Sequence, residues 1–229
     1  MTMKNAESRA RMQDGVSRPR GRRQQRSDAE TRRLIIGAAT RIFLASGFRG
    51  TNMEAVAQAA GVSKKTIYRL VPTKEDLFGA VISMRSEAVN RQISDDSSHG
   101  AAEAQRTLRR YLLDLGLLVL SEETVALNRL IYAEAQQFPA MVHSYYAAGP
   151  QRGLDNLTVW LEARRREGVF RLDDAREAAE MLMAMVIGEP LRVAVLGIAA
   201  APDSAAIARR VDRAVGIFLR GCLVQPGAA

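Results

Sequence analysis

Apolar residues recur at helical spacing along most of the chain, and this pattern predicts an all-α protein. The first apolar stripe begins after Asp28 and consists of Leu34, Ile35, Ala38, Ala39, Ile42 and Phe43. Apolar residues three or four positions apart share one face of a helix. With Ser27 or Asp28 as its N-cap, we predict a first helix that ends at Gly47.

Three further helices are predicted in the N-terminal third, over about 53–60, 63–70 and 73–90. Gly61 and Pro72 separate them, because glycine adopts the left-handed conformation at a helix end and proline cannot continue a helix. The candidate N-caps are Thr51 or Asn52, then Ser63, then Thr73.

The rest of the chain has the same periodicity, broken at intervals by glycine and proline. The predicted helices cover about 102–120, 122–137, 140–146, 151–167, 174–197 and 204–223. The predicted breakers are Phe138-Pro139, Gly149-Pro150, Gly168 and Ala201-Pro202-Asp203. No run alternates between apolar and polar residues as a half-buried strand does.

Residues 1–27 carry few large apolar side chains and many arginines, so we expect a disordered arm. We predict a small N-terminal helical domain over 28–78 and a larger C-terminal helical domain over 79–229.

The net charge of +8 is concentrated at one end of the chain. Residues 1–27 carry +6 and residues 28–80 carry +3, whereas the remainder sums to −1. A basic end on a neutral body is typical of a module that binds a polyanion such as nucleic acid or an anionic membrane.

Other features restrict the class of protein. Cys222 is the single cysteine, which excludes an internal disulfide and fits a reducing, cytoplasmic setting. The most apolar stretch, 181–201, is interrupted by Glu189, Pro190 and Arg192, so we expect no membrane helix. No catalytic, metal-binding or cofactor-binding motif is apparent, and we expect no enzymatic activity.

The segment 53–70 fits a helix-turn-helix. Ala57 is small where the two helices cross, Gly61 tolerates a positive φ at the turn, and Ile67 anchors the second helix in the core. The residues left facing outward are Ser63, Lys64, Lys65, Thr66, Tyr68 and Arg69. The alternative is an ordinary helical hairpin with a solvated face.

This segment also resembles a known family. Thr31 to Phe78 is similar to the DNA-binding domain of the TetR family of bacterial repressors, through Phe48-Arg-Gly-Thr51, Val56-Ala57, Gly61-Val-Ser63, Thr66-Ile-Tyr68 and Lys74-Glu-Asp-Leu-Phe78. The resemblance implies that Thr51, Tyr68 and Lys74 contact phosphate, and that Lys64, Lys65 and Thr66 face the major groove beside Ser63. Many relatives have a polar residue where this chain has Leu70, so no phosphate contact is expected there.

The arm contains Ser17-Arg-Pro-Arg-Gly-Arg-Arg23, which resembles an AT-hook. We expect Arg20, Gly21 and Arg22 to enter an A·T-rich minor groove, because glycine allows close approach and arginine favours the negative potential there. A solvated basic tail is the alternative.

The resemblance further implies that the second domain encloses a pocket for a small, largely apolar effector. The candidate lining residues are Tyr132, Phe138, His143, Trp160, Met181 and Met185. Methionine and aromatic stripes are more often plain core. The last two helices, about 174–197 and 204–223, would pair with a second subunit as a four-helix bundle.

The expected protein is therefore a homodimer that binds a palindromic DNA operator, blocks transcription and is released by an effector. Two alternatives belong to other classes. One is an effector-independent architectural DNA-binding dimer, and the other is a helical enzyme with an incidental basic arm.

Overall fold

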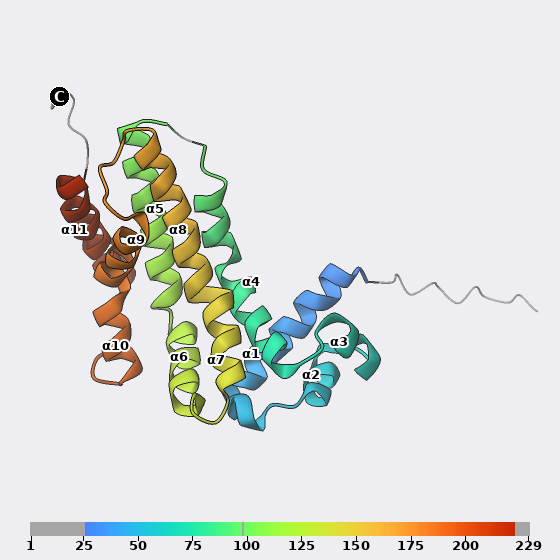
Figure 1. The fold of residues 1–229 in the computed structure, drawn as a ribbon. Coiled ribbons are helices and arrows are strands. Elements are labelled where there is room, and N and C mark those ends of the chain that lie inside the picture. Colours follow the sequence, from blue (N-terminus) through green and yellow to red (C-terminus); the bar gives the residue numbers. More distant parts are fainter. Residues whose placement is uncertain (1–25, 98, 223–229) are drawn as a thin grey trace, which may run out of the picture.

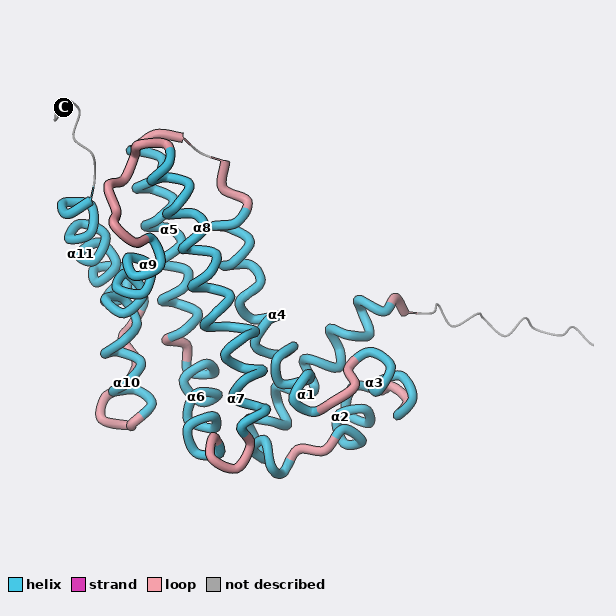
Figure 2. Tube along the Cα trace, viewed as in Figure 1, coloured by secondary structure: helices cyan, strands magenta, loops and turns pink. Residues whose placement is uncertain are grey.

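The computed structural model describes residues 26–97 and 99–222, and every regular element in these ranges is a helix (Figure 2). The α-helices are α1 (Asp28–Gly50), α2 (Met53–Ala60), α3 (Lys64–Leu70), α4 (Lys74–Ser94), α5 (Ala101–Val119), α6 (Glu122–Glu134), α7 (Pro139–Tyr146), α8 (Arg152–Arg166), α9 (Ala175–Met183), α10 (Glu189–Val195) and α11 (Ser204–Cys222). Two single π turns, η1 (Ala147–Gln151) and η2 (Ala184–Gly188), lie between α7 and α8 and between α9 and α10. The all-α prediction is confirmed.

Side-chain caps begin the first four helices where the sequence predicted them. Ser27 forms a capping box with Glu30 at the start of α1. Asn52, Ser63 and Thr73 each accept a backbone N–H three residues later, at the starts of α2, α3 and α4. Each cap satisfies a donor that the first helical turn leaves unpaired.

The prediction that α1 ends at Gly47 was wrong in one respect. Gly47 has φ 71° and ψ 176°, and the chain bends there and then makes one further turn to Gly50. A residue with a side chain rarely adopts such a φ. The bend redirects the chain toward α2.

Gly61 closes α2 in the left-handed conformation, with φ 65° and ψ 37°. No atom lies within 4 Å of the position a Cβ would take there, so substitution meets conformational strain and no clash. We expect Gly61→Ala to lower the free energy of unfolding by about 1–2 kcal/mol, measured by urea denaturation. Gly221→Ala is the control, since that glycine also has open space but has no positive φ, and alanine in helix α11 should leave stability unchanged or raise it by up to about 1 kcal/mol.

The predicted break at Gly149-Pro150 was also wrong, because 139–166 runs as one helix through η1. Proline lacks the backbone N–H and its ring clashes with the carbonyl four residues earlier. The wider π turn accommodates Pro150 without ending the helix. A second π turn directly precedes Pro190, which is buried at the start of α10.

Figure 1 shows α1, α2 and α3 as a lobe at one side of the molecule, and α10 and α11 at the opposite side. α4 runs from this lobe, hereafter the head, into the bundle formed by the later helices. α4 packs on α1, α5, α7 and α8, and α6 packs on α1 and α10. α4 and α6 therefore both connect the head with the rest of the protein.

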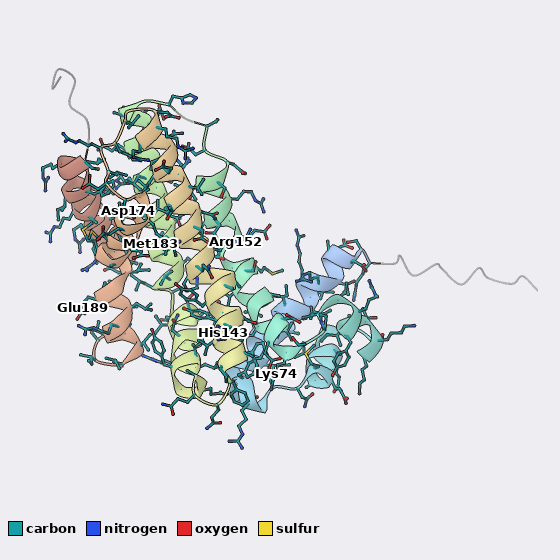
Figure 3. The ribbon with its side chains drawn as sticks, in the orientation of Figure 1. Lys74, His143, Arg152, Asp174, Met183 and Glu189 are labelled. Atoms are coloured by element: carbon teal, nitrogen blue, oxygen red, sulfur yellow. The ribbon has the colours of Figure 1, made fainter. Side chains whose placement is uncertain are left out.

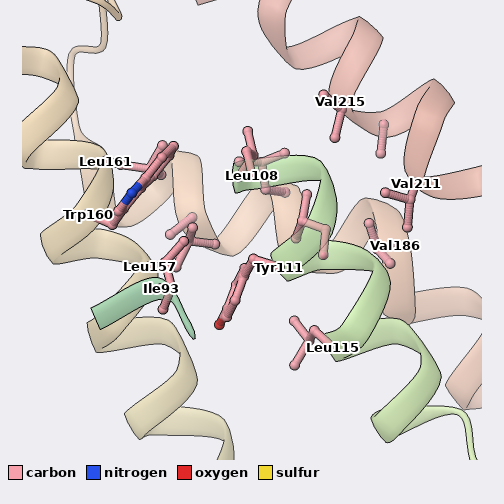
Figure 4. Packing of buried hydrophobic residues seen from close by; sticks show 14 of the residues in the cluster. Ile93, Leu108, Tyr111, Leu115, Leu157, Trp160, Leu161, Val186, Val211 and Val215 are labelled. Atoms are coloured by element: carbon pink, nitrogen blue, oxygen red, sulfur yellow. The ribbon is translucent and has the colours of Figure 1, made fainter. Parts of the chain in front are cut away.

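The buried apolar side chains form two clusters. The larger lies among α5, α8, α9, η2 and α11, where Tyr111, Leu157, Trp160 and Val211 are packed together (Figure 4). The smaller cluster lies in the head and at the start of α4, where the rings of Phe43, Phe48 and Phe78 contact one another. The smaller cluster also includes Leu127, Ile131 and Met141 from α6 and α7.

Candidate functional site

The outward face of α3 is the first candidate site. Ile67 is fully buried and anchors the helix, while Ser63, Lys64, Lys65 and Tyr68 are exposed as predicted. Thr66 is half-buried, and its hydroxyl shares a hydrogen bond of 2.8 Å with that of Ser63. The fold thus presents basic and hydroxyl side chains on one short helix.

Two cations of this helix are paired with acidic side chains of the head. Lys64 donates to Glu54 of α2, and this hydrogen bond lowers the pKa of Glu54 and raises that of Lys64. Both guanidinium nitrogens of Arg69 donate to the Asp28 carboxylate at 2.7 Å, which lowers the pKa of Asp28. No ion pair involves Lys65 within the described ranges. Among the described residues, Lys64 therefore has an acidic partner and Lys65 has none.

Thr51 and Lys74 do not face outward, in contrast to the roles implied by the family resemblance. The Thr51 side chain is only 2% exposed, and its hydroxyl donates to the carbonyl of Gly47 at 2.7 Å. The ammonium of Lys74 (labelled in Figure 3) donates to the carbonyls of Phe48 at 2.8 Å and Thr51 at 3.0 Å. It also lies 4.5 Å from the centre of the Phe48 ring. Both polar groups are used to hold the α1–α2 connection.

Glu134, at the end of α6, holds the same connection from the other side. Its carboxylate oxygens accept the backbone N–H groups of Phe48 at 3.0 Å and Arg49 at 2.8 Å. A Cβ on Gly47 would lie 2.5 Å from Glu134 Oε1, so the bend needs glycine to let the carboxylate approach. Glu134 therefore links α6 directly to the head.

The second candidate site is a cavity of about 230 Å³ inside the bundle. Its wall is mostly aliphatic and comes from α4, α5, α6, the continuous run of α7, η1 and α8 (the α7–α8 helix) and the continuous run of α9, η2 and α10 (the α9–α10 helix). The lining residues are Ile82, Arg85, Ser86, Val89, Asn90, Leu115, Leu118, Val119, Thr124, Leu127, Asn128, Tyr145, Gly149, Pro150, Gly153, Met183, Ile187 and Leu191. The two helices that reach the head, α4 and α6, thus also form part of this wall.

None of the six residues expected to line an effector pocket is on the wall of this cavity. Tyr132, His143 and Met181 are exposed at the surface. Phe138 packs on Phe48 with ring centres 5.1 Å apart, at the contact between α7 and the head.

The other two residues are placed differently. Trp160 is in the larger buried cluster, packs on Phe170 and donates to Asp96 at 2.8 Å. Met185 lies in a surface depression beside α11, together with Pro190 and Ile217. The cavity wall is instead mostly aliphatic, and its aromatic residue and its methionine are Tyr145 and Met183.

Sequence analysis missed the polar residues on the wall, although one signal was available. Asn90 continues the inward face of α4 set by Ile82, Ser86 and Ile93, at helical spacing. An asparagine at a buried helical position is unusual, because buried polar groups need partners.

Arg20, Gly21 and Arg22 of the arm lie outside the described residues. Within the described ranges no helix has both the length and the apolar character needed to cross a membrane. The same ranges contain no group of three or more histidine, cysteine, aspartate or glutamate side chains placed to hold a metal ion.

Comparison with known proteins agrees with this arrangement. Residues 35–81 match the bacterial regulatory proteins of the tetR family, and residues 106–221 match the AefR-like transcriptional repressor C-terminal domain. The HTH-type transcriptional regulator YvkB of Bacillus subtilis is 25% identical over 160 residues, which cover 69% of this chain and 80% of YvkB.

Two solved structures are similar over most of the chain. A TetR-family transcriptional regulator from Mesorhizobium loti is 29% identical, with a TM-score of 0.72 over 87% of this chain and 100% of its own. The flavonoid-responsive regulator FrrA is 31% identical, with a TM-score of 0.67 over 86% of this chain and 100% of its own. This chain belongs to the TetR family of DNA-binding transcriptional regulators, whose members are typically repressors with a ligand-binding C-terminal domain.

Proposed function

We propose that this chain is a homodimeric repressor that binds a palindromic operator through α3 and is released when a small molecule occupies the bundle cavity. The observation that carries this proposal is the cavity wall, because α4 and α6 form part of it and both helices also reach the head. The proposed protein acts by binding alone, without a cofactor or catalysis, and works in the cytoplasm.

The proposed DNA contacts lie on the outward face of α3. Lys65 and Thr66 would face base edges, with Ser63, Lys64 and Tyr68 at their flanks near the phosphates. In a two-fold dimer the two copies of α3 would enter successive major grooves about 34 Å apart. Thr51 and Lys74 would support this surface from inside the head, through the hydrogen bonds described above.

The proposed dimer forms through the α9–α10 helix and α11. Several large apolar side chains are exposed on or next to these helices: Met181, Leu196, Ile198 and Ile217. A helix that packs only on its own domain needs apolar side chains on one face, so these exposed side chains have no role in that packing. A helix bundle shared with a second subunit would cover them.

The proposed release depends on how a ligand would affect α4 and α6. A ligand shifts a conformational equilibrium only if it binds one conformation better than the other. Thr124 and Asn128 of α6 line the cavity, and nearly two turns later Glu134 holds the bend of α1. Between them, Arg129 donates to the carbonyls of Ala194 and Val195 at the end of α10. Displacement of α6 by a ligand would therefore act on the head and on the proposed dimer helix together.

The test is selection of bound sequences from random DNA duplexes at physiological salt, followed by titration of ligands against the selected complex. The proposal expects a two-fold symmetric motif, and loss of binding when a cavity ligand is added. An A·T-rich set without symmetry would overturn it and favour an architectural DNA-binding protein.

The arm provides a separate prediction. If residues 1–24 enter the minor groove beside the α3 site, their deletion should weaken operator binding and reduce the slope of log affinity against log salt. Because each neutralised phosphate adds roughly 0.9 to that slope, losing several arginines should be readily measured. Unchanged affinity and slope in the truncated protein would contradict a DNA-binding role for the arm.

A further inference from the structure

Among the described residues, Asn90 places a polar group without a hydrogen-bond partner on the wall of the bundle cavity. Asn90 of α4 is on its wall and is 3% exposed. The Asn90 side-chain Nδ2 has no hydrogen-bond partner in the part of the chain that the structure describes. An unpaired buried donor is costly, and most buried polar groups in native proteins are paired. This amide is therefore a donor that a bound molecule can satisfy.

The other polar side chains on the wall are already paired. Arg85 donates to Glu123 and to the hydroxyl of Thr124, so its charge is balanced. The phenol of Tyr145 donates to Asn128 Oδ1 at 2.9 Å, and Asn128 Nδ2 donates to the carbonyl of Thr124 at 2.9 Å. The cavity thus offers no unpaired cation that would favour an anion.

The remaining wall sets the size and polarity of the occupant. Apolar side chains such as Val89, Leu115, Met183 and Ile187 surround the space. A Cβ on Gly149 would lie 2.7 Å from Ile82 Cγ2, so the α7–α8 helix packs tightly on α4 there. The cavity volume of about 230 Å³ exceeds the roughly 150 Å³ of an engineered apolar cavity that holds benzene.

We infer that the effector is a neutral, mainly apolar molecule of about two fused rings with a hydrogen-bond acceptor oxygen, and that Asn90 selects it by donating to that oxygen. The inference rests on the proposed function, since it names the ligand class of the same cavity. A site built around an unpaired donor discriminates strongly against an analogue that lacks the acceptor.

The test is calorimetric titration of the full chain, without DNA, using three probes of similar size: 1-tetralone, tetralin and 1-naphthoate. Tetralone differs from tetralin by a carbonyl oxygen, and naphthoate carries a negative charge. We expect tetralone to bind the natural protein at least about tenfold more tightly than tetralin, because one hydrogen bond to a buried donor contributes about 1.4 kcal/mol or more. Naphthoate should bind most weakly.

Asn90→Leu has a similar shape and no donor. We expect it to bind tetralone about tenfold more weakly and to keep its affinity for tetralin, which also shows that the variant is folded. Asn156→Leu on α8 is the matched control, since Asn156 is not on the cavity wall, and should keep the preference for tetralone.

Four results would overturn the inference: equal affinity of the natural protein for tetralone and tetralin, an unchanged preference in Asn90→Leu, tightest binding of naphthoate, or no binding of any probe. Failure of the proposed function is a different result. In that case tetralone would bind with the expected dependence on Asn90 but would not release the operator.

Discussion

Replacing Lys65 with alanine is expected to reduce operator affinity by about 30-fold to 20,000-fold. Lys65 is exposed on the outward face of α3 and has no ion pair within the described ranges, whereas Glu54 engages the neighbouring Lys64. A lysine that donates to a guanine base edge contributes about 1–3 kcal/mol. In a two-fold dimer a single substitution removes two such contacts, so the loss counts twice.

The measurement is a binding titration at several salt concentrations. If Lys65 contacts phosphate, the salt slope should fall by about one for each contact. If it contacts a base, the slope should change less and discrimination between operators should weaken. Arg110→Ala on α5 removes the same charge from a helix outside the head and should leave the affinity nearly unchanged. Full affinity in Lys65→Ala would exclude α3 as the recognition helix.

The second large effect is expected at Glu134. Glu134→Ala leaves the N–H groups of Phe48 and Arg49 without the carboxylate that accepts both of them. Hydrogen bonds to a charged group contribute about 1.5–3 kcal/mol each, and water replaces part of this at a half-exposed site. We expect the free energy of unfolding, measured with urea, to fall by about 2–4 kcal/mol. Glu134→Gln keeps one acceptor oxygen and should lose less.

A matched control is Glu122→Ala, at the exposed start of the same helix. That change removes a favourable charge near a helix N-terminus and should cost at most about 1 kcal/mol. If α6 transmits release, the operator complex of Glu134→Gln should also need more ligand to dissociate than that of the natural protein. A Glu134→Ala variant as stable as the Glu122→Ala control would show that the α6 contact contributes little.

Features determined by neighbouring residues in the chain were predictable from sequence. The caps Ser63 and Thr73 and the turn at Gly61 depend on local geometry, and each lies where the sequence predicted it. The burial of Ile67 follows from helical spacing in the same way.

Features that depend on packing between distant segments were not predictable. Pro150 continues a helix because a π turn packed on α4 accommodates it, and nothing in the local sequence records that contact. Lys74 turns inward because Phe48 and Thr51 bring carbonyl oxygens to it from α1.

The cavity shows the same limit. Trp160 and Met181 are the residue types expected in a ligand pocket, yet one is packed in the core and the other is exposed. The actual wall depends on which faces of α4 and α6 are left uncovered inside the bundle. The position of Asn90, a polar residue within the apolar stripe of α4, was the feature of the sequence that indicated the cavity.

The composition of the smaller buried cluster has a consequence for protein engineering. Leu127, Ile131 and Met141 from α6 and α7 complete the apolar interior around the rings of the head. A segment that ends at residue 78 would expose that interior, so residues 28–78 cannot be transferred to another protein as an independent folding unit. A chimaera that transfers its operator specificity to another sensor should graft the outward residues of α3 alone, or carry α6 and α7 along with the first four helices.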